Sequence, residues 1–237
     1  MINMKKRTVI LAYLLFVLTI VFPLGVLISS CFGYTFELTN VSSFAIAIAL
    51  ISIVLCILSS KEKKPHKNGV LGVIFTIFTP LSIVNAVFFM LASPKIQVII
   101  SAFIAIGCSV YLTIKHGTLR ILKIILCVIS AILILPIGLM GFILLIFSNI
   151  GHNAVVQTVE SPNGAYYAEV IDSDQGALGG DTLVNIYENT EINLLIFKIS
   201  RNSQRVYQGE WGEFKDMKVY WMNDQCLVIN SVEYPIE

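Results

Sequence analysis

The densest group of acidic side chains lies in a glycine-rich stretch, residues 172–181. Asp172, Asp174 and Asp181 offer the carboxylate oxygens that Ca²⁺ prefers. The spacing departs from the EF-hand loop, because a glycine stands at the fifth position instead of the sixth and Leu183 replaces the bidentate glutamate. The stretch is therefore either a cation-binding site that differs from the EF-hand or a solvated loop between two strands.

A second group of candidate side chains is aromatic. Trp211, Tyr207 and Tyr220 have ring faces that can stack on a ligand, and Glu210 and Glu213 flank Trp211 as carboxylates do in some sugar sites. Aromatic residues of a half-buried sheet also form its core, so ligand binding and packing both stay open. A carboxylate pair can cleave glycosides, but a short C-terminal part leaves little room for a substrate cleft.

Motifs for catalysis are absent from the sequence. The C-terminal part has one histidine, His152, with no serine or cysteine nucleophile motif near it. The chain contains no Gly-x-Ser-x-Gly, His-Glu-x-x-His or paired Cys-x-x-Cys. We therefore expect no enzymatic activity and no cofactor.

Cys31 is a candidate for lipidation. The segment Ile28-Ser29-Ser30-Cys31 resembles the cleavage box of bacterial lipoproteins, in which small residues precede the cysteine that is acylated. The alternative is a helix end rich in small residues beside a chance cysteine. In both cases the C-terminal part lies on the same side of a membrane.

The elements that must position these residues begin with five apolar stretches. The chain of 237 residues is 56% hydrophobic and only 13% charged, whereas soluble domains are about 25% charged. A bilayer core about 30 Å thick needs roughly 20 apolar residues in a helix. The expected spans are residues 8–30, 41–60, 69–92, 96–114 and 119–148.

The formal charge of +1 hides two parts of opposite sign. Residues 1–148 carry eleven Lys and Arg against two acids, a charge of +9. Residues 149–237 carry five against thirteen, a charge of −8. We therefore expect two domains, a helical membrane domain over 1–148 and a second domain over 149–237 in a different solvent.

Lysine and arginine close to the membrane predict the orientation, because cytoplasmic loops collect them. With five spans, ten of these cations fall on one side and only Lys95 on the other. The ten are Lys5, Lys6, Arg7, Lys61, Lys63, Lys64, Lys67, Lys115, Arg120 and Lys123. We expect a multi-pass cell-membrane protein with a cytoplasmic N-terminus and an extracytoplasmic C-terminal domain.

The interiors of the spans carry no charged residue, which disfavours a proton-coupled transporter. Asn85 either bonds a neighbouring helix or lines a small polar cavity. Pro23, Pro80 and Pro136 each remove a backbone hydrogen bond and bend a helix.

The C-terminal part has the period-2 alternation of short strands. Expected strands are 154–159, 165–173, 182–188, 193–199, 205–208, 217–222, 225–229 and 232–236. Asn223-Asp224 and Asn230-Ser231 suit tight turns, since these residues tolerate positive φ. The fold class is therefore a five-helix membrane domain followed by a small all-β antiparallel sheet or sandwich.

Several turn and strand motifs of residues 155–236 resemble those of one protein family. The motifs are Ser161-Pro162-Asn163-Gly164-Ala165-Tyr166-Tyr167, Gly176-Ala177, Val219-Tyr220-Trp221-Met222-Asn223-Asp224 and Val228-Ile229-Asn230. Together they are similar to an uncharacterised family of small Gram-positive bacterial membrane proteins with a C-terminal extracytoplasmic β domain of unknown function. This chain departs from the family at Ser231, where a glycine is common. The resemblance implies a fold and no activity.

These observations favour a membrane protein that displays an acidic β domain outside the cell as a binding or sensing module. The expected partners are the lipid bilayer and an envelope protein or cell-wall component. Nucleic acid is disfavoured, because phosphate backbones need basic partners. The alternative is an accessory subunit or cap of a transport or export system.

Overall fold

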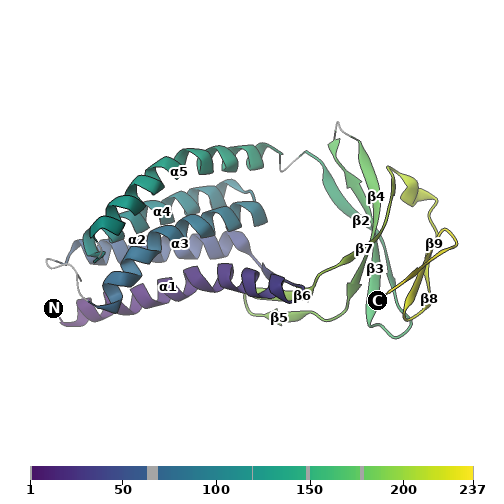
Figure 1. Ribbon diagram of the computed structural model, residues 1–237, viewed down its shortest axis with the longest axis horizontal. Helices are drawn as coiled ribbons and strands as arrows, with labels where there is room; N and C mark the ends of the chain where they lie inside the picture. The colour runs from purple at the N-terminus through teal and green to yellow at the C-terminus, as the bar shows by residue number, and fades with distance from the viewer. Residues whose placement is uncertain (1, 63–68, 119, 148–149, 177–178, 237) are drawn as a thin grey trace. The chain divides into compact units, whose positions relative to one another are not determined.

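The computed structural model describes residues 2–62, 69–118, 120–147, 150–176 and 179–236, with the side chains of residues 2–5 left out. The chain divides into two compact units (Figure 1). The helical unit comprises residues 1–28 and 38–146, and the β unit comprises residues 29–37 and 147–237. Lys63, Lys64 and Lys67, which contributed to the predicted orientation, lie outside the described residues.

The helical unit contains five helices. They are α1 (Ile2–Cys31), α2 (Val41–Ser60), α3 (Val70–Ala92), α4 (Ile96–His116) and α5 (Arg120–Phe147). All five are long and apolar enough to cross a membrane, which confirms the helical part of the expected fold class within the described residues. The Asn40 side chain caps α2 by accepting a hydrogen bond from Ser43 N at 2.9 Å.

Small side chains allow the helices to approach closely. Ala86 and Met90 of α3 pack against Ala102 and Ile106 of α4 and against Ile137 of α5. Pro23, Pro80 and Pro136 lie inside α1, α3 and α5, as expected from the sequence. Many large apolar side chains of the helices point outward, which suits contact with lipid.

The β unit contains three antiparallel sheets. A four-stranded sheet has the order β2-β3-β4-β7, and two three-stranded sheets have the orders β10-β9-β8 and β1-β6-β5. The strands are β1 (Tyr34–Leu38), β2 (His152–Glu160), β3 (Tyr166–Asp174), β4 (Gly180–Glu188), β5 (Ile192–Leu194), β6 (Phe197–Arg201), β7 (Gln204–Glu210), β8 (Val219–Asn223), β9 (Cys226–Ile229) and β10 (Val232–Pro235). A short 3₁₀ helix, η2 (Glu213–Lys215), follows β7.

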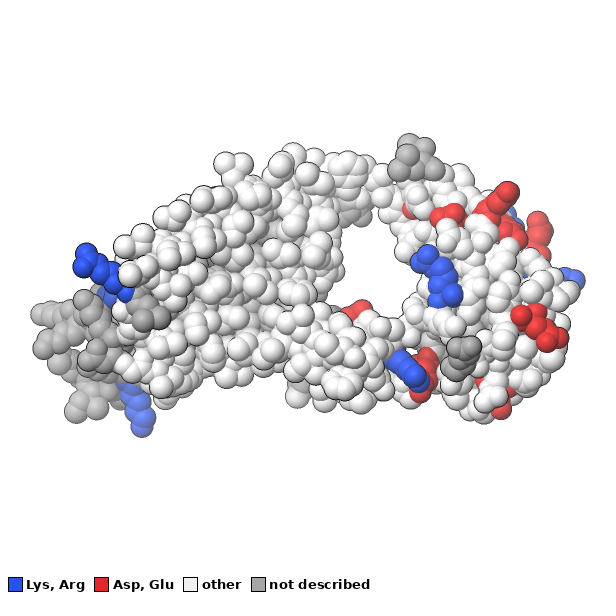
Figure 2. Space-filling model, in the orientation of Figure 1, with Lys and Arg blue, Asp and Glu red and all other residues white. Residues whose placement is uncertain are grey.

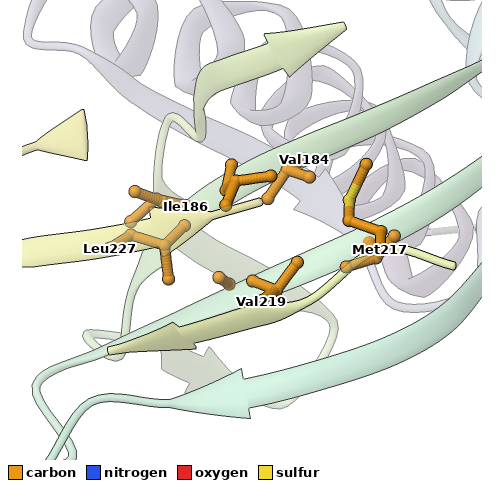
Figure 3. Packing of buried hydrophobic residues seen from close by; sticks show 8 residues of the cluster. Val184, Ile186, Met217, Val219 and Leu227 are labelled. Carbon is orange, nitrogen blue, oxygen red and sulfur yellow. The ribbon is translucent and has the colours of Figure 1, made fainter. Parts of the chain in front are cut away.

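Two of these sheets form a sandwich around one core. Figure 3 shows Val184 and Ile186 of β4 facing Val219 and Leu227 of the opposite sheet, with Met217 beside them. The remaining core residues are Ala168, Val170 and Ile229, and every member of the core is at most 8% exposed. The expected small antiparallel β domain is therefore confirmed.

Charge separates the two units as the sequence predicts. On the face in view, Figure 2 shows acidic side chains gathered over the β unit, whereas the helical unit is almost uncharged except for cations at one end. Thirteen of the fifteen acids belong to residues 149–237.

Two expected features of the strands are wrong. The run 193–199 is not one strand but the hairpin β5–β6, with Leu194 paired to Phe197 across a turn at Leu195-Ile196. The period-2 pattern missed this turn because neither turn residue is glycine, proline or asparagine. The β8–β9 loop is Asp224-Gln225, one residue beyond the expected Asn223-Asp224, because Asn223 pairs with Cys226.

Another expected turn is confirmed, and one strand was not expected. Asn230 and Ser231 have φ of 48° and 70° and connect β9 to β10 in a tight turn. Strand β1 lies between α1 and α2, in a connection for which the sequence indicated no strand. It pairs with β6, which lies more than 150 residues later in the chain.

Removing the Leu227 side chain tests the core. Leu227 is completely buried, so Leu227→Ala should destabilise the β unit by about 2–5 kcal/mol. Trp211 and Trp221 are the only tryptophans and both lie in the β unit, so their fluorescence during urea unfolding of the full-length protein reports on this unit. Met222→Ala, at a side chain 53% exposed, is the control. Equal unfolding midpoints for the two variants would contradict the assignment of the core.

Candidate functional site

The predicted metal-site residues hold three different hydrogen-bond partners. Asp172 Oδ1 accepts a hydrogen bond from Trp211 Nε1 at 3.2 Å. Asp174 Oδ1 accepts from Gly176 N at 2.7 Å, and Asp181 Oδ2 accepts from Gln175 Nε2 at 3.0 Å. Each carboxylate therefore takes part in a different structural contact.

Strand register also places these carboxylates on different faces. Asp181 pairs with Ser173, so it shares a face with Ser173, whereas Asp172 and Asp174 alternate to the other face. Among the described residues, no group of three or more His, Cys, Asp or Glu is placed to hold a metal ion. Residues 177–178 of this stretch lie outside the described residues, and the cation site stays a prediction.

The three candidate aromatic residues do not form one site. Tyr207 packs against the sandwich core, and its hydroxyl donates to Glu213 Oε1 at 2.6 Å. Trp211 is 56% exposed at the end of the sheet, where its indole covers Gly180 so closely that a Cβ there would lie 2.6 Å from Cδ1. Tyr220 is exposed on β8 of the other sheet.

Cys31 is exposed at the last residue of α1. All five cysteines lie in described parts of the chain, and all are free thiols. The position at a helix end is compatible with acylation, which stays a prediction.

A row of polar side chains crosses the outer face of the four-stranded sheet, the face away from the sandwich core. Thr158 of β2 pairs with Glu169 of β3, Glu169 pairs with Asn185 of β4, and Asn185 pairs with Arg205 of β7. Directly paired residues of antiparallel strands point to the same side. These four residues, called here the polar row, therefore present two hydrogen-bond acceptors, a cation and a hydroxyl side by side.

Asn185 occupies the centre of the polar row and is incompletely satisfied. Its Oδ1 atom is buried and has no hydrogen-bond partner among the described residues. An unpaired buried acceptor costs about 1–3 kcal/mol, and native structures keep few of them. The fold alone does not account for a polar group here.

Tyrosine and aliphatic side chains border the polar row. On one side Tyr167 and Tyr187 stack with ring centroids 5.0 Å apart and an interplanar angle of 7°. Burial, followed by the nearby negative charges of Glu169 and Glu191, raises the pKa of Tyr167. On the other side Ile171 and Leu183 are paired and buried. Apolar borders lower the local dielectric and strengthen hydrogen bonds made at the row.

The sequence analysis did not identify the polar row. Its residues are separated by 11 to 20 positions along the chain and carry no motif. The sequence held no direct signal for the polar row, because these four residues become neighbours only when the strands are paired in the correct register. Alternation within Tyr167–Ile171 and Leu183–Tyr187 was visible, but two bulges in the flanking pairs concealed the partners in β2 and β7.

Asn85 is a buried polar residue of α3, and it does both things that the sequence left open. Its Nδ2 donates to Thr19 O of α1 at 2.7 Å and to Leu81 O at 2.9 Å. Its buried Oδ1 has no hydrogen-bond partner among the described residues. Asn85 lines a cavity with Ser82 and Ser101 that has room for about one water molecule.

Ser59 and His116 form a second polar contact in the helical unit, with Ser59 Oγ 2.5 Å from His116 Nε2. The imidazole stacks on Phe75 at 4.8 Å between centroids, and Lys115 Nζ donates to the Ser59 carbonyl. A serine beside a histidine is a nucleophile–base combination. Both side chains are fully buried, so this pair is closed to substrate and joins α2 to α4.

Comparisons of the chain with protein-family models, curated proteins and solved structures found no match. The family suggested by the turn motifs therefore stays a prediction. The functional interpretation rests on the polar row, its borders and the chemistry of the membrane spans.

The Tyr207–Glu213 hydrogen bond gives a testable pH dependence. The bond to the carboxylate, together with burial, raises the pKa of Tyr207 to about 12. The folded-state pKa exceeds the unfolded value of about 10, so the stabilising contribution is complete below pH 10 and is lost as the pH rises through about 12. Glu213→Gln should lower this pKa, and tyrosinate absorbance of the full-length protein measures it.

The Tyr207→Phe variant identifies which tyrosine titrates. It should lack the component near pH 12, whereas Tyr220→Phe should retain it. An identical titration for Glu213→Gln and the unaltered protein would contradict the role of the carboxylate.

Proposed function

We propose that this chain is a multi-pass membrane protein whose five helices anchor an extracytoplasmic binding module, the β unit. The polar row carries this proposal. A sheet face needed only for folding is expected to satisfy its buried acceptors, whereas Asn185 Oδ1 stays unpaired between a carboxylate and a guanidinium.

The chemistry of the polar row favours a ligand rich in hydrogen-bond donors. The side-chain oxygens of Glu169 and Asn185 can accept hydrogen bonds from a ligand. The exposed Arg205 side chain can move aside from the buried Asn185 Oδ1, or it can donate to a ligand oxygen. Stacked tyrosines supply an apolar edge of the kind on which sugar rings pack. We name a cell-wall glycan as the ligand, and the charge of −8 over residues 149–237 makes nucleic acid an unfavourable alternative.

Orientation follows from the positive-inside bias, supported by the pairing of β1 with β6. Residues 33–36 follow the first span, and residues 197–202 follow the fifth, yet they belong to one sheet. Two segments of one sheet must lie on the same side of a bilayer. Both segments follow an odd number of spans, one and five, which puts them on the same side, opposite to the N-terminus. This proposal places that side outside the cell.

Binding to peptidoglycan tests the polar row. Full-length protein in nanodiscs should co-sediment with purified peptidoglycan sacculi, and Asn185→Leu should weaken binding at least about fivefold, as expected for a lost hydrogen bond of about 1–3 kcal/mol. The same change removes an unpaired buried acceptor, so the urea midpoint of the β unit should not fall. Tyr220→Ala, on the other sheet, should bind normally. Wild-type protein that stays in the supernatant, or equal binding by Asn185→Leu, would refute the proposal.

Reporter fusions test the orientation. Fusions after Lys64, Lys95 and Glu237 should report inside, outside and outside, because ten of the eleven cations near the spans lie on one side. A cytoplasmic signal from the fusion after Glu237 would overturn the arrangement.

A second candidate function is an accessory role in transport, with the β unit as a cap. The observation that favours it is the Asn85 cavity, since Asn85 Oδ1 is buried there with no hydrogen-bond partner among the described residues. Deletion of residues 150–237 separates the two functions. If the remaining helices rescue every phenotype of a full deletion, the helices are the working part and the binding-module proposal fails.

A further inference from the structure

The β5–β6 hairpin has an apolar turn. Its two-residue connection is Leu195-Ile196, where two-residue turns usually have Asn-Gly or a similar polar pair. Leu195 is fully exposed, and Ile192, Leu194 and Ile196 are 41–57% exposed. These four side chains, called here the apolar tip, form an exposed cluster that the core of the β unit does not use.

The chain itself places this hairpin next to the bilayer. β1 lies within residues 32–40, the connection between the last residue of α1 and the first residue of α2. β1 is joined to β6 by a hydrogen bond from Asn202 N to Gly33 O at 3.0 Å and by a contact of 2.7 Å between the hydroxyls of Thr35 and Ser200. A strand held between two membrane spans keeps its hydrogen-bonded neighbours near the membrane surface.

The direction of pairing determines which end of the hairpin is near the start of α2. Gly33 lies beside Asn202, and Phe36 contacts Phe197 with ring centroids 4.8 Å apart, so β1 and β6 are antiparallel. The turn before Phe197 therefore lies at the Leu38 end of β1, three residues before α2 begins at Val41. Three extended residues span at most about 10 Å and adjacent strands are about 4.8 Å apart, so this connection keeps the Phe197 end of the hairpin within about 15 Å of the start of α2.

We propose that the apolar tip inserts into the headgroup–acyl boundary of the bilayer that its own helices span. Aliphatic side chains at this depth bury apolar area against lipid. The insertion adds a non-covalent attachment of the β unit to the membrane, besides the chain connections to α1, α2 and α5. It is independent of any ligand bound at the polar row.

The charges near the apolar tip indicate the class of lipid. Lys198 Nζ pairs with Glu191 Oε1 at 2.5 Å, and Arg201 pairs with Glu188. Both cations are neutralised by neighbouring carboxylates, so they contribute little attraction to anionic headgroups. Insertion is therefore driven by apolar area and does not require anionic lipid.

Photo-crosslinking tests the proposal in full-length protein. Benzoyl-phenylalanine replaces Leu195 in one sample and Met222, an exposed side chain of β8, in the control. In phosphatidylcholine nanodiscs, irradiation should give a phospholipid-mass adduct at position 195 and none at position 222. Absence of the adduct at 195, equal yields at both positions, or capture of a protein in place of lipid at 195 in cell membranes would overturn the proposal.

A double variant separates insertion from hairpin folding. Leu195→Asn with Ile196→Gly removes the apolar side chains and introduces the pair that two-residue hairpin turns prefer. If the tip is in lipid, amide hydrogen exchange at residues 194–197 in nanodiscs should be faster in this variant than in the unaltered protein. If the tip is in water, the better turn should leave exchange unchanged or slower, and that result contradicts insertion. The exposed control Met222→Ala should exchange like the unaltered protein over these residues.

Discussion

The structure depends first on the inability of a bilayer interior to hydrogen-bond with peptide groups. Helices satisfy their backbone internally, so the apolar part of the chain crosses as helices. Polar side chains in the spans obey the same constraint, since the hydroxyls of Thr19, Ser52 and Ser130 each donate to the carbonyl four residues earlier. Asn85 makes one such bond and uses its other amide hydrogen to join α3 to α1.

The same constraint ends where the chain leaves the bilayer, and there the first connection between spans becomes part of the β unit. Strand β1 completes a sheet whose other strands come from residues 192–201. The β unit is therefore not a contiguous C-terminal segment, and a fragment of residues 150–237 lacks one of its strands. The chain therefore joins the β unit to the helical unit at three points: after α1, before α2 and after α5.

Sequence patterns with a fixed period were sufficient for most of the fold. Four of the five helices begin within one residue of their expected start, because hydropathy marks the bilayer directly. Strands β2, β3 and β4 follow from alternation. The β5–β6 turn was missed because its residues are apolar, and β1 because a strand of five residues has too little pattern of its own. The polar row depends on register, which long-range pairing determines and no local pattern encodes.

Asn85 and Asn185 each have a buried side-chain oxygen with no hydrogen-bond partner among the described residues, but their surroundings differ. In Asn85 the amide cannot rotate by half a turn, because its oxygen would then face the carbonyls of Thr19 and Leu81. Asn85 lines the small cavity with Ser82 and Ser101, which has room for about one water molecule. Asn185 instead lies on a sheet face between Glu169 and the exposed Arg205. Under the proposed function, a shift of the Arg205 side chain opens the buried Asn185 oxygen to a ligand. The geometry that makes Asn85 a structural residue is missing at Asn185, which is why the polar row, rather than the membrane cavity, carries the functional proposal.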